Sequence, residues 1–365
     1  MFRNHLRRAA LLSAVAIAAV SVSSCETPAP EPAPAPVVVA PPPPPAPVSV
    51  YPRVVEQAAA FEAYMTRAAG ITPSFTDGPS IARSLTIAAA YEPRQLATGA
   101  VAYGAVAALQ DPVFVEGVRA YLRNPEQRAE IAAKLAADPA YVTGFPGASG
   151  AAGMVAAALD REGRRVRVAG EGVKQSAYSI QRQAWSKTAI PNPELRLASV
   201  KALGTALPPA DTPTIERLRS LALGQTPSTA APASAQPPYT PVVVRSLAIA
   251  ALSALGYGDD PTFAQSFDTL LVEPTGGSCL NMSKLNLNQC LAVAKPWYED
   301  VFCLGQHVLI DTGQCVVQAG NAPPPAMLPA SATPLTASTP AAAAVQTGAT
   351  TVATAQAQPA ATPIN

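Results

Sequence analysis

The sequence is poor in the residues and spacings that mark most enzymes. It has only two histidines among 365 residues, and it contains no Gly-x-Ser-x-Gly and no Ser-x-x-Lys motif. Both motifs place a nucleophilic serine beside its activating groups, so their absence removes the local signs of serine hydrolases. No two cysteines have the short spacing of a zinc site. The sequence therefore predicts no cofactor and no metal, and it favours a protein without enzymatic activity over an enzyme.

The first 24 residues contain the segments of a bacterial export signal in their usual order, a basic segment followed by an apolar one. Three arginines lie within the first eight residues, and residues 9–20 are an unbroken run of apolar and small residues. Such a run suits a signal peptide and is short for a membrane span. Val22-Ser23-Ser24-Cys25 follows. This segment resembles the lipobox of bacterial lipoproteins, in which an aliphatic residue and two small residues precede a cysteine.

The lipobox resemblance implies cleavage before Cys25 and lipidation of its thiol. Fatty acyl chains such as palmitate hold a protein on a membrane, since each buried CH₂ contributes about 0.8 kcal/mol. Glu26 follows the cysteine. Enteric bacteria retain lipoproteins in the inner membrane through Asp at this place, so Glu26 favours the outer membrane, with the chain facing the periplasm. The resemblance thus implies a membrane partner through the lipid on Cys25.

The mature chain lacks an excess of either charge. Removing residues 1–24 takes three of the 25 basic residues and none of the 24 acidic ones, which leaves 22 against 24. This balance argues against nucleic acid as a partner and against a polybasic membrane patch. No later stretch reaches the roughly 18 uncharged apolar residues of a second membrane span. Residues 242–255 come closest, but Arg245 interrupts them.

Clusters of proline and small residues divide the chain. Alternating and consecutive prolines in residues 25–52 exclude a helix and predict an extended tether of about 3.1 Å per residue. The tail is too poor in bulky apolar residues to offset its ordering entropy, so we expect it to be disordered. The predicted divisions are a signal peptide (1–24), the lipidated Cys and tether (25–52), a helical domain (53–223), a Pro/Ser/Ala loop (224–241), a Cys-containing helical part (242–318) and a disordered tail (319–365).

The folded region has the apolar period of helices and almost no strand-like alternation. We predict a mainly α fold of stacked helical hairpins, with a disulfide-stapled C-terminal part. A long helix is expected over 155–187, where apolar residues recur every seven positions from Leu159. Gly163, Gly170 and Gly172 each weaken that helix by about 1 kcal/mol relative to Ala. The other predicted helices are 54–69, 80–91, 93–109, 112–122 and 126–136.

One short unit recurs before predicted helices: an acidic or polar cap, proline, and an aromatic or aliphatic residue two positions later. Asp supplies the N-cap and Pro occupies the first helical position, so the residue two positions after Pro should pack inward. The copies begin at Asp111, Asp138, Asp211 and Asp260. Residues 193–204 and 241–256 resemble the first helices of HEAT-like repeats. The irregular spacing of the copies favours stacked hairpins over a regular solenoid.

Four cysteines follow Cys25 within 37 residues: Cys279, Cys290, Cys303 and Cys315. In an exported chain they predict two disulfides. We favour Cys279–Cys290 with Cys303–Cys315, because sequence neighbours close short loops. The alternative, Cys290–Cys303 with Cys279–Cys315, would join two helices. Pro296 is expected to begin a new helix.

The candidates for chemistry are few. His307 lies four residues after Cys303 and is the weak candidate for catalysis, although we expect that cysteine to be bridged. The glycine-rich loop 147–153 lacks the lysine of a phosphate site, and we interpret it as a helix start. Tyr178 and Trp185 are expected in the core rather than in a binding stripe. The remaining charged candidates are the arginines 161, 164, 165 and 167, interpreted as a solvated face, and Glu92, Glu116 and Glu171, which nothing local marks.

These features favour a membrane-anchored, periplasm-facing lipoprotein with a structural or interaction role in the cell envelope. Its partner would be an envelope protein or peptidoglycan. The alternative is a cell-wall hydrolase whose two carboxylates are brought together only by the fold. That alternative requires a cleft with paired carboxylates, or an acid beside His307.

Overall fold

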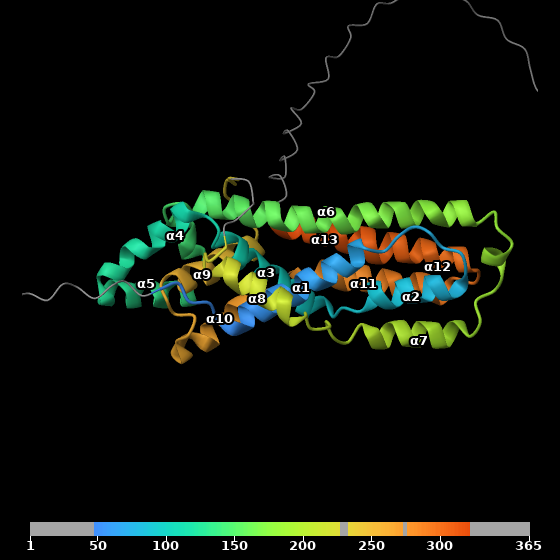
Figure 1. The fold of residues 1–365 in the computed structure, drawn as a ribbon, viewed down its shortest axis with the longest axis horizontal. Helices are drawn as coiled ribbons and strands as arrows, with labels where there is room; N and C mark the ends of the chain where they lie inside the picture. The colour runs from blue at the N-terminus through green and yellow to red at the C-terminus, as the bar shows by residue number, and fades with distance from the viewer. Residues whose placement is uncertain (1–46, 227–232, 273–275, 322–365) are drawn as a thin grey trace, which may run out of the picture. The chain divides into compact units, whose positions relative to one another are not determined.

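The structure is a computed structural model that describes residues 47–226, 233–272 and 276–321. The predicted signal peptide, the lipobox, most of the tether and all but the first residues of the tail lie outside these ranges. Within them the chain is mainly helical, as predicted, and forms stacked hairpins (Figure 1). The α-helices are α1 (Pro52–Ala69), α2 (Gly78–Ala89), α3 (Pro93–Ala108), α4 (Pro112–Arg119), α5 (Pro125–Ala137), α6 (Ala148–Ile180), α7 (Pro193–Leu203), α8 (Thr212–Ala222), α9 (Pro241–Ala254), α10 (Ala264–Leu271), α11 (Gly276–Val293), α12 (Trp297–Cys303) and α13 (Asp311–Gly320).

The recurring Asp-Pro unit caps helices as predicted. Asp111 Oδ1 accepts hydrogen bonds from the backbone N–H of Val113 (2.9 Å) and Phe114 (3.0 Å). Asp138, Asp211 and Asp260 accept equivalent bonds at the starts of their helices. Each cap satisfies an N–H that has no partner within the helix.

The inward packing predicted for the residue two positions after Pro is confirmed only in part. Phe114 is fully buried, but Tyr141 remains 39% exposed. The reason is local, since Pro139–Gly144 forms a short 3₁₀ helix instead of an α-helix. Its three residues per turn rotate side chains differently. Tyr141 therefore packs against the edge of Phe145, with ring centroids 5.6 Å apart.

The long helix α6 is shifted from its predicted range. Gly147 adopts φ +79° at its N-cap, a conformation that favours glycine, and the helix begins at Ala148. It ends at Ile180 rather than at residue 187. The Ser186 hydroxyl donates to the carbonyl oxygens of Ile180 and Gln183. These bonds fold the chain into a 3₁₀ turn at Trp185–Lys187.

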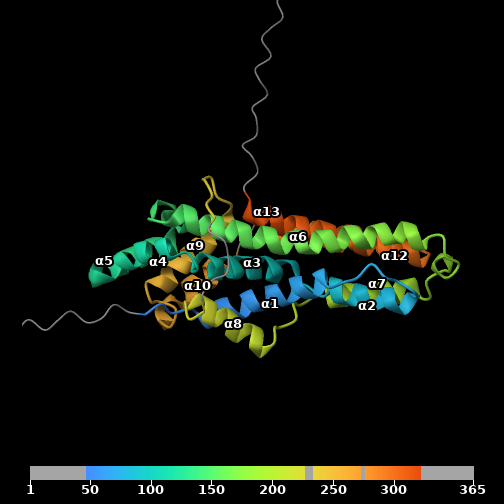
Figure 2. The same cartoon turned by 45° about the horizontal axis from the view of Figure 1, so that its top comes forward.

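Two glycines of α6 mark where the C-terminal helices cross it. Figures 1 and 2 show α13 and α12 lying alongside α6 in both views. A Cβ built on Gly163 would lie 2.5 Å from the carbonyl oxygen of Gly313, and one on Gly170 would lie 2.7 Å from Leu309 Cβ. These glycines therefore permit backbone contact that a larger residue would prevent.

One apolar core joins both sides of the 224–241 loop. It includes residues of α1, α3, α6, α9, α11 and α13. The end of the predicted tether also packs on this core: Val50 is 5% exposed, and the Ser49 N–H donates to the carbonyl oxygen of Ser253 (3.1 Å). Among the described helices, none is long and apolar enough to cross a membrane.

Candidate interaction site

Helix α11 is apolar on two opposite faces. Leu280, Leu287 and Leu291 point into the core and are at most 4% exposed. On the outside, Met282, Leu285 and Val293 are 55%, 48% and 74% exposed. Gln289 and Ala292 are exposed between them. We call the outer set the α11 stripe: Met282, Leu285, Gln289, Ala292 and Val293.

The outer face of α11 carries no charge. Lys284 is the one charged residue in the helix, and its ammonium turns inward. It donates to the carbonyl oxygen of Ala89 and lies 4.0 Å from the ring centroid of Tyr91. Burial lowers the pKa of Lys284 to about 8. The α11 stripe is therefore an uncharged surface on which Met282, Leu285 and Val293 are each at least 48% exposed.

An aromatic pocket adjoins the C-terminal end of the stripe. It has a volume of about 330 Å³. Tyr178 of α6 is 50% exposed and meets Phe302 of α12 edge-on, at 6.3 Å between centroids. Val293 belongs both to the stripe and to the pocket wall. We call this the Tyr178 pocket; its lining residues are Ala177, Tyr178, Gln181, Cys290, Val293, Ala294, Tyr298, Glu299, Phe302 and Cys303.

The expectation that Tyr178 lies in the core is wrong. Its neighbours Ala177 and Ile180 are buried in the same turns of α6, and Tyr178 lies on another face of the helix, where its ring lines a pocket at the surface. Trp185 is half-buried, and its indole N–H donates to Gln183 Oε1 at 2.5 Å. The seven-residue spacing of these aromatics did not reveal that α6 would end between them.

The cysteines form two disulfides, but the favoured pairing is wrong. The bonds are Cys279–Cys315 and Cys290–Cys303, each with a Cα–Cα distance of 5.7 Å. Cys279 and Cys290 lie on one continuous helix, where 11 residues span about 16 Å. That separation exceeds the reach of a disulfide, roughly 7 Å between Cα atoms. The nested pairing instead joins α11 to the helices that follow it.

His307 does not form a pair with a free thiol, because Cys303 is bridged to Cys290. His307 lies in the π-helical segment Leu304–Ile310. Its Nδ1 is 3.0 Å from Asp311 Oδ2. The Ser283 hydroxyl donates to the backbone carbonyl oxygen of His307 (2.6 Å) rather than to the ring. This bond satisfies a carbonyl within the π-helical turn, which makes the role of Ser283 structural.

A polar chain continues from Asp311 to helix α6. Gln306 donates to Asp311 Oδ1 (3.0 Å) and accepts from Lys174 (2.7 Å). An acid does lie beside His307, as the hydrolase alternative requires. The acid's contacts, however, join the π-helical segment to α6. Among the described residues the His307 ring contacts Asp311 and Phe302, neither of which offers a hydroxyl or thiol.

The four arginines of α6 are all paired, in agreement with a solvated face. Arg164 binds Asp160 (2.6 Å), Arg167 binds Glu171 (2.6 Å), and both Arg161 and Arg165 bind Glu162. Of the other carboxylates, Glu92 caps α3 by accepting from the N–H of Gln95 (2.7 Å).

Two carboxylates come close enough to influence each other, Glu62 and Glu162. Burial raises the pKa of Glu62, and the charge of Glu162 adds to this, while Arg217 acts against it. Arg217 binds Glu62 directly. Nearby, burial raises the pKa of Tyr103 to about 12. Each carboxylate is thus held by arginine, and no local sequence pattern marks this cluster.

A buried ion pair fixes α7 to the body of the protein. Arg196 Nη1 lies 2.5 Å from Asp300 Oδ1, and Asp300 is fully buried. Arg196 also donates to the carbonyl oxygen of Leu291. Burial raises the pKa of Asp300 to about 6, although Arg196 acts to lower it. The sequence placed Asp300 in the first turn of a helix but did not predict its partner.

In the part of the chain that the structure describes, no three His, Cys, Asp or Glu side chains gather as metal ligands. Comparisons with family models, curated proteins and solved structures found no match for this chain. The resemblance to HEAT-like repeats therefore stays a prediction. Among the described residues, the α11 stripe and the Tyr178 pocket form an adjoining apolar surface without charge on α11, and such a surface suits contact with another apolar surface.

Proposed function

We propose that this protein is a lipid-anchored lipoprotein of the bacterial envelope that faces the periplasm and binds another protein surface. The observation that carries this proposal is the α11 stripe, an exposed and uncharged helix face that continues into the Tyr178 pocket. Exposed apolar side chains are common singly, but a contiguous set of them marks an interaction site.

The export part of the proposal is supported by the order of residues 1–25 and by the disulfides. Two disulfides persist in an oxidising compartment and are rare in the cytosol. The proline-rich sequence predicted as a tether after Cys25 also suits a domain that meets a partner away from the membrane surface. The outer membrane is favoured over the inner membrane by Glu26 alone.

The binding part rests on how the stripe and pocket are built. Met282, Leu285 and Val293 offer apolar area, and Tyr178 and Tyr298 offer aromatic area with a hydroxyl. Tyrosine of this kind is enriched in the centres of protein interfaces, because it buries a large area at a small cost in entropy.

The test of binding is photo-crosslinking in intact cells. A photo-crosslinking amino acid at position 285 should yield discrete crosslinked products. The matched control is position 168, where Val168 is 59% exposed on α6, outside the stripe. Equal crosslinking at both positions, or none at 285, would remove the interaction role.

The test of anchoring is separate. Wild-type protein should incorporate labelled palmitate, and Cys25→Ala should abolish that incorporation. Label that persists in Cys25→Ala would contradict lipidation at this cysteine while leaving the binding proposal intact.

A further inference from the structure

The wall of the Tyr178 pocket contains a carboxylate. Among the described residues that line the pocket, Glu299 is the one charged side chain, and none is a lysine, arginine or histidine. Glu299 is half-buried and lies in the first turn of α12, where its Oε2 accepts a hydrogen bond from the backbone N–H of Lys295 (2.9 Å). The residues of the wall therefore carry a net negative charge.

Three aromatic rings share the wall with this carboxylate, those of Tyr178, Tyr298 and Phe302. The face of an aromatic ring is electronegative and attracts cations. The protein already uses this attraction beside the pocket, because Lys174 Nζ lies 5.4 Å from the ring centroid of Phe302 and donates to Gln306 Oε1 (2.7 Å). A carboxylate and aromatic rings in one pocket are the combination that binds organic ammonium ions.

We infer that the Tyr178 pocket receives the side chain of a lysine on the partner protein. The inference rests on the proposed function, whose site it shares. The aliphatic stem of lysine packs on apolar wall residues such as Val293, and its ammonium binds Glu299 and the rings of Tyr178 and Tyr298. A purely apolar side chain would remove water from Glu299 and offer no partner in return. An acidic side chain would meet a like charge.

The hydrogen bond from Lys295 favours lysine over arginine as the occupant. A guanidinium group pairs best when it binds both oxygens of a carboxylate at once. In Glu299 the backbone N–H of Lys295 already occupies Oε2, which hinders this paired geometry. An ammonium group is a point charge and needs only the other oxygen.

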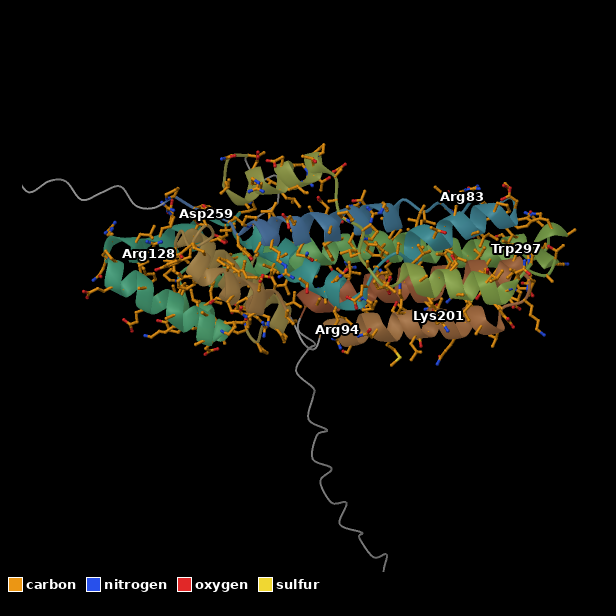
Figure 3. All side chains as sticks on the ribbon, turned by 90° about the horizontal axis from the view of Figure 1, so that it is seen from below. Arg83, Arg94, Arg128, Lys201, Asp259 and Trp297 are labelled. Carbon is orange, nitrogen blue, oxygen red and sulfur yellow. A yellow bond between two sulfur atoms is a disulfide. The ribbon has the colours of Figure 1, made fainter. Side chains whose placement is uncertain are left out.

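The ammonium of a phosphoethanolamine lipid headgroup fits the pocket less well, because its phosphate would approach the pocket carboxylate. Figure 3 shows Trp297, the residue before Tyr298, at one end of the helical stack and Asp259 at the other end. Beside Asp259, the Gly258 N–H donates to Ser49 Oγ (2.8 Å), at the end of the predicted tether. The pocket thus lies far from the place where the tether joins the helices, which favours a protein as the source of the ammonium.

The experiment measures binding of Nα-acetyl-lysine methylamide to the mature full-length chain with Cys25→Ala. Saturation-transfer NMR suits this probe, because a single side chain binds weakly and exchanges fast. The comparison probes are the norleucine analogue, which lacks the ammonium, the arginine analogue and phosphoethanolamine. The lysine probe should bind most tightly, and its affinity should fall as salt is added.

Glu299→Gln tests the charge alone, since the glutamine oxygen can still accept from the Lys295 N–H. This variant and Tyr178→Leu should each weaken binding of the lysine probe about fivefold or more, whereas Tyr178→Phe keeps the ring and should bind like wild type. The matched control is Asp259→Asn, which removes an exposed carboxylate outside the pocket and should leave binding unchanged. Circular dichroism and the melting temperature show that each variant is folded.

Equal binding of the lysine and norleucine probes, or unchanged binding in Glu299→Gln, would overturn the inference. Tightest binding of phosphoethanolamine would overturn it in favour of a lipid headgroup. If the lysine probe fails while position 285 still crosslinks a protein, the proposed function stands without the lysine. If position 285 crosslinks nothing, the proposed function fails whatever the probes show.

Discussion

Two glycines of α6 should respond to alanine in opposite directions. Glycine inside a helix costs up to about 1 kcal/mol relative to Ala, so open glycine positions gain stability from the substitution. At Gly172 the nearest atom to a built Cβ is 3.8 Å away, on Pro73. Gly172→Ala should therefore raise the free energy of unfolding by about 0.5–1 kcal/mol.

At Gly163 the same change meets backbone. The built Cβ lies 2.5 Å from the Gly313 carbonyl oxygen and 2.8 Å from the Val317 nitrogen. Neither atom belongs to a flexible side chain, so α6 and α13 must separate. Overpacking of this kind costs about 1–3 kcal/mol, which outweighs the gain in helix propensity. Gly163→Ala should lower the free energy of unfolding by about 1–2 kcal/mol after that gain is subtracted.

Urea denaturation of the oxidised protein, followed by circular dichroism, measures both changes. The free energies of unfolding of the two variants should differ by about 1.5–3 kcal/mol, with opposite signs relative to wild type. If Gly163→Ala raised the midpoint as Gly172→Ala does, the close approach of α6 and α13 would be refuted. A loss of two-state behaviour in one variant would be seen as a change in the slope of the transition.

Three further predictions follow from other contacts. Burial raises the folded-state pKa of Asp300 from the ordinary 3.8 to about 6. The stability linked to this group is therefore present below pH 4 and is lost as pH rises through 6. In urea titrations at pH 4 and 7, Asp300→Asn should reduce the difference in the free energy of unfolding between the two pH values by about 2 kcal/mol. Asp111→Ala should cost about 1 kcal/mol through loss of the α4 cap, and Asp111→Asn should restore most of it. Proteolysis and mass spectrometry of the unreduced protein should recover the nested disulfide peptides, and linkage of Cys279 to Cys290 would contradict the structure.

The features that the sequence predicted best are those that depend on residues close together in the chain. The Asp-Pro caps depend on atoms within four residues of one another, so the sequence alone identified these aspartates as N-caps. The helix period likewise placed α1 to α5 within a few residues of their bounds. The end of α6 was missed because hydrogen bonds of Ser186 decide it, and no period reveals them.

Features that depend on distant contacts were not predictable in the same way. The disulfide pairing required knowing that α11 is one unbroken helix, which puts its two cysteines too far apart to bond. The α11 stripe was missed because Met282, Leu285 and Val293 look like core residues in the sequence. Only the fold shows that α11 buries its other face. The pairing of Arg196 with Asp300 spans 104 residues and left no local sign.

The nested disulfides also determine which native contacts persist when the protein unfolds without reduction. Cys290–Cys303 encloses a short loop, and Cys279–Cys315 encloses that loop within a larger one. A chain that unfolds without reduction keeps these two pairs of cysteines joined, so the segment that forms α11 stays linked to the segments that follow it. Much of the entropy of closing these loops is then already lost before refolding starts. When such a chain refolds, the residues that form α11 therefore start already joined at two points to their native neighbours.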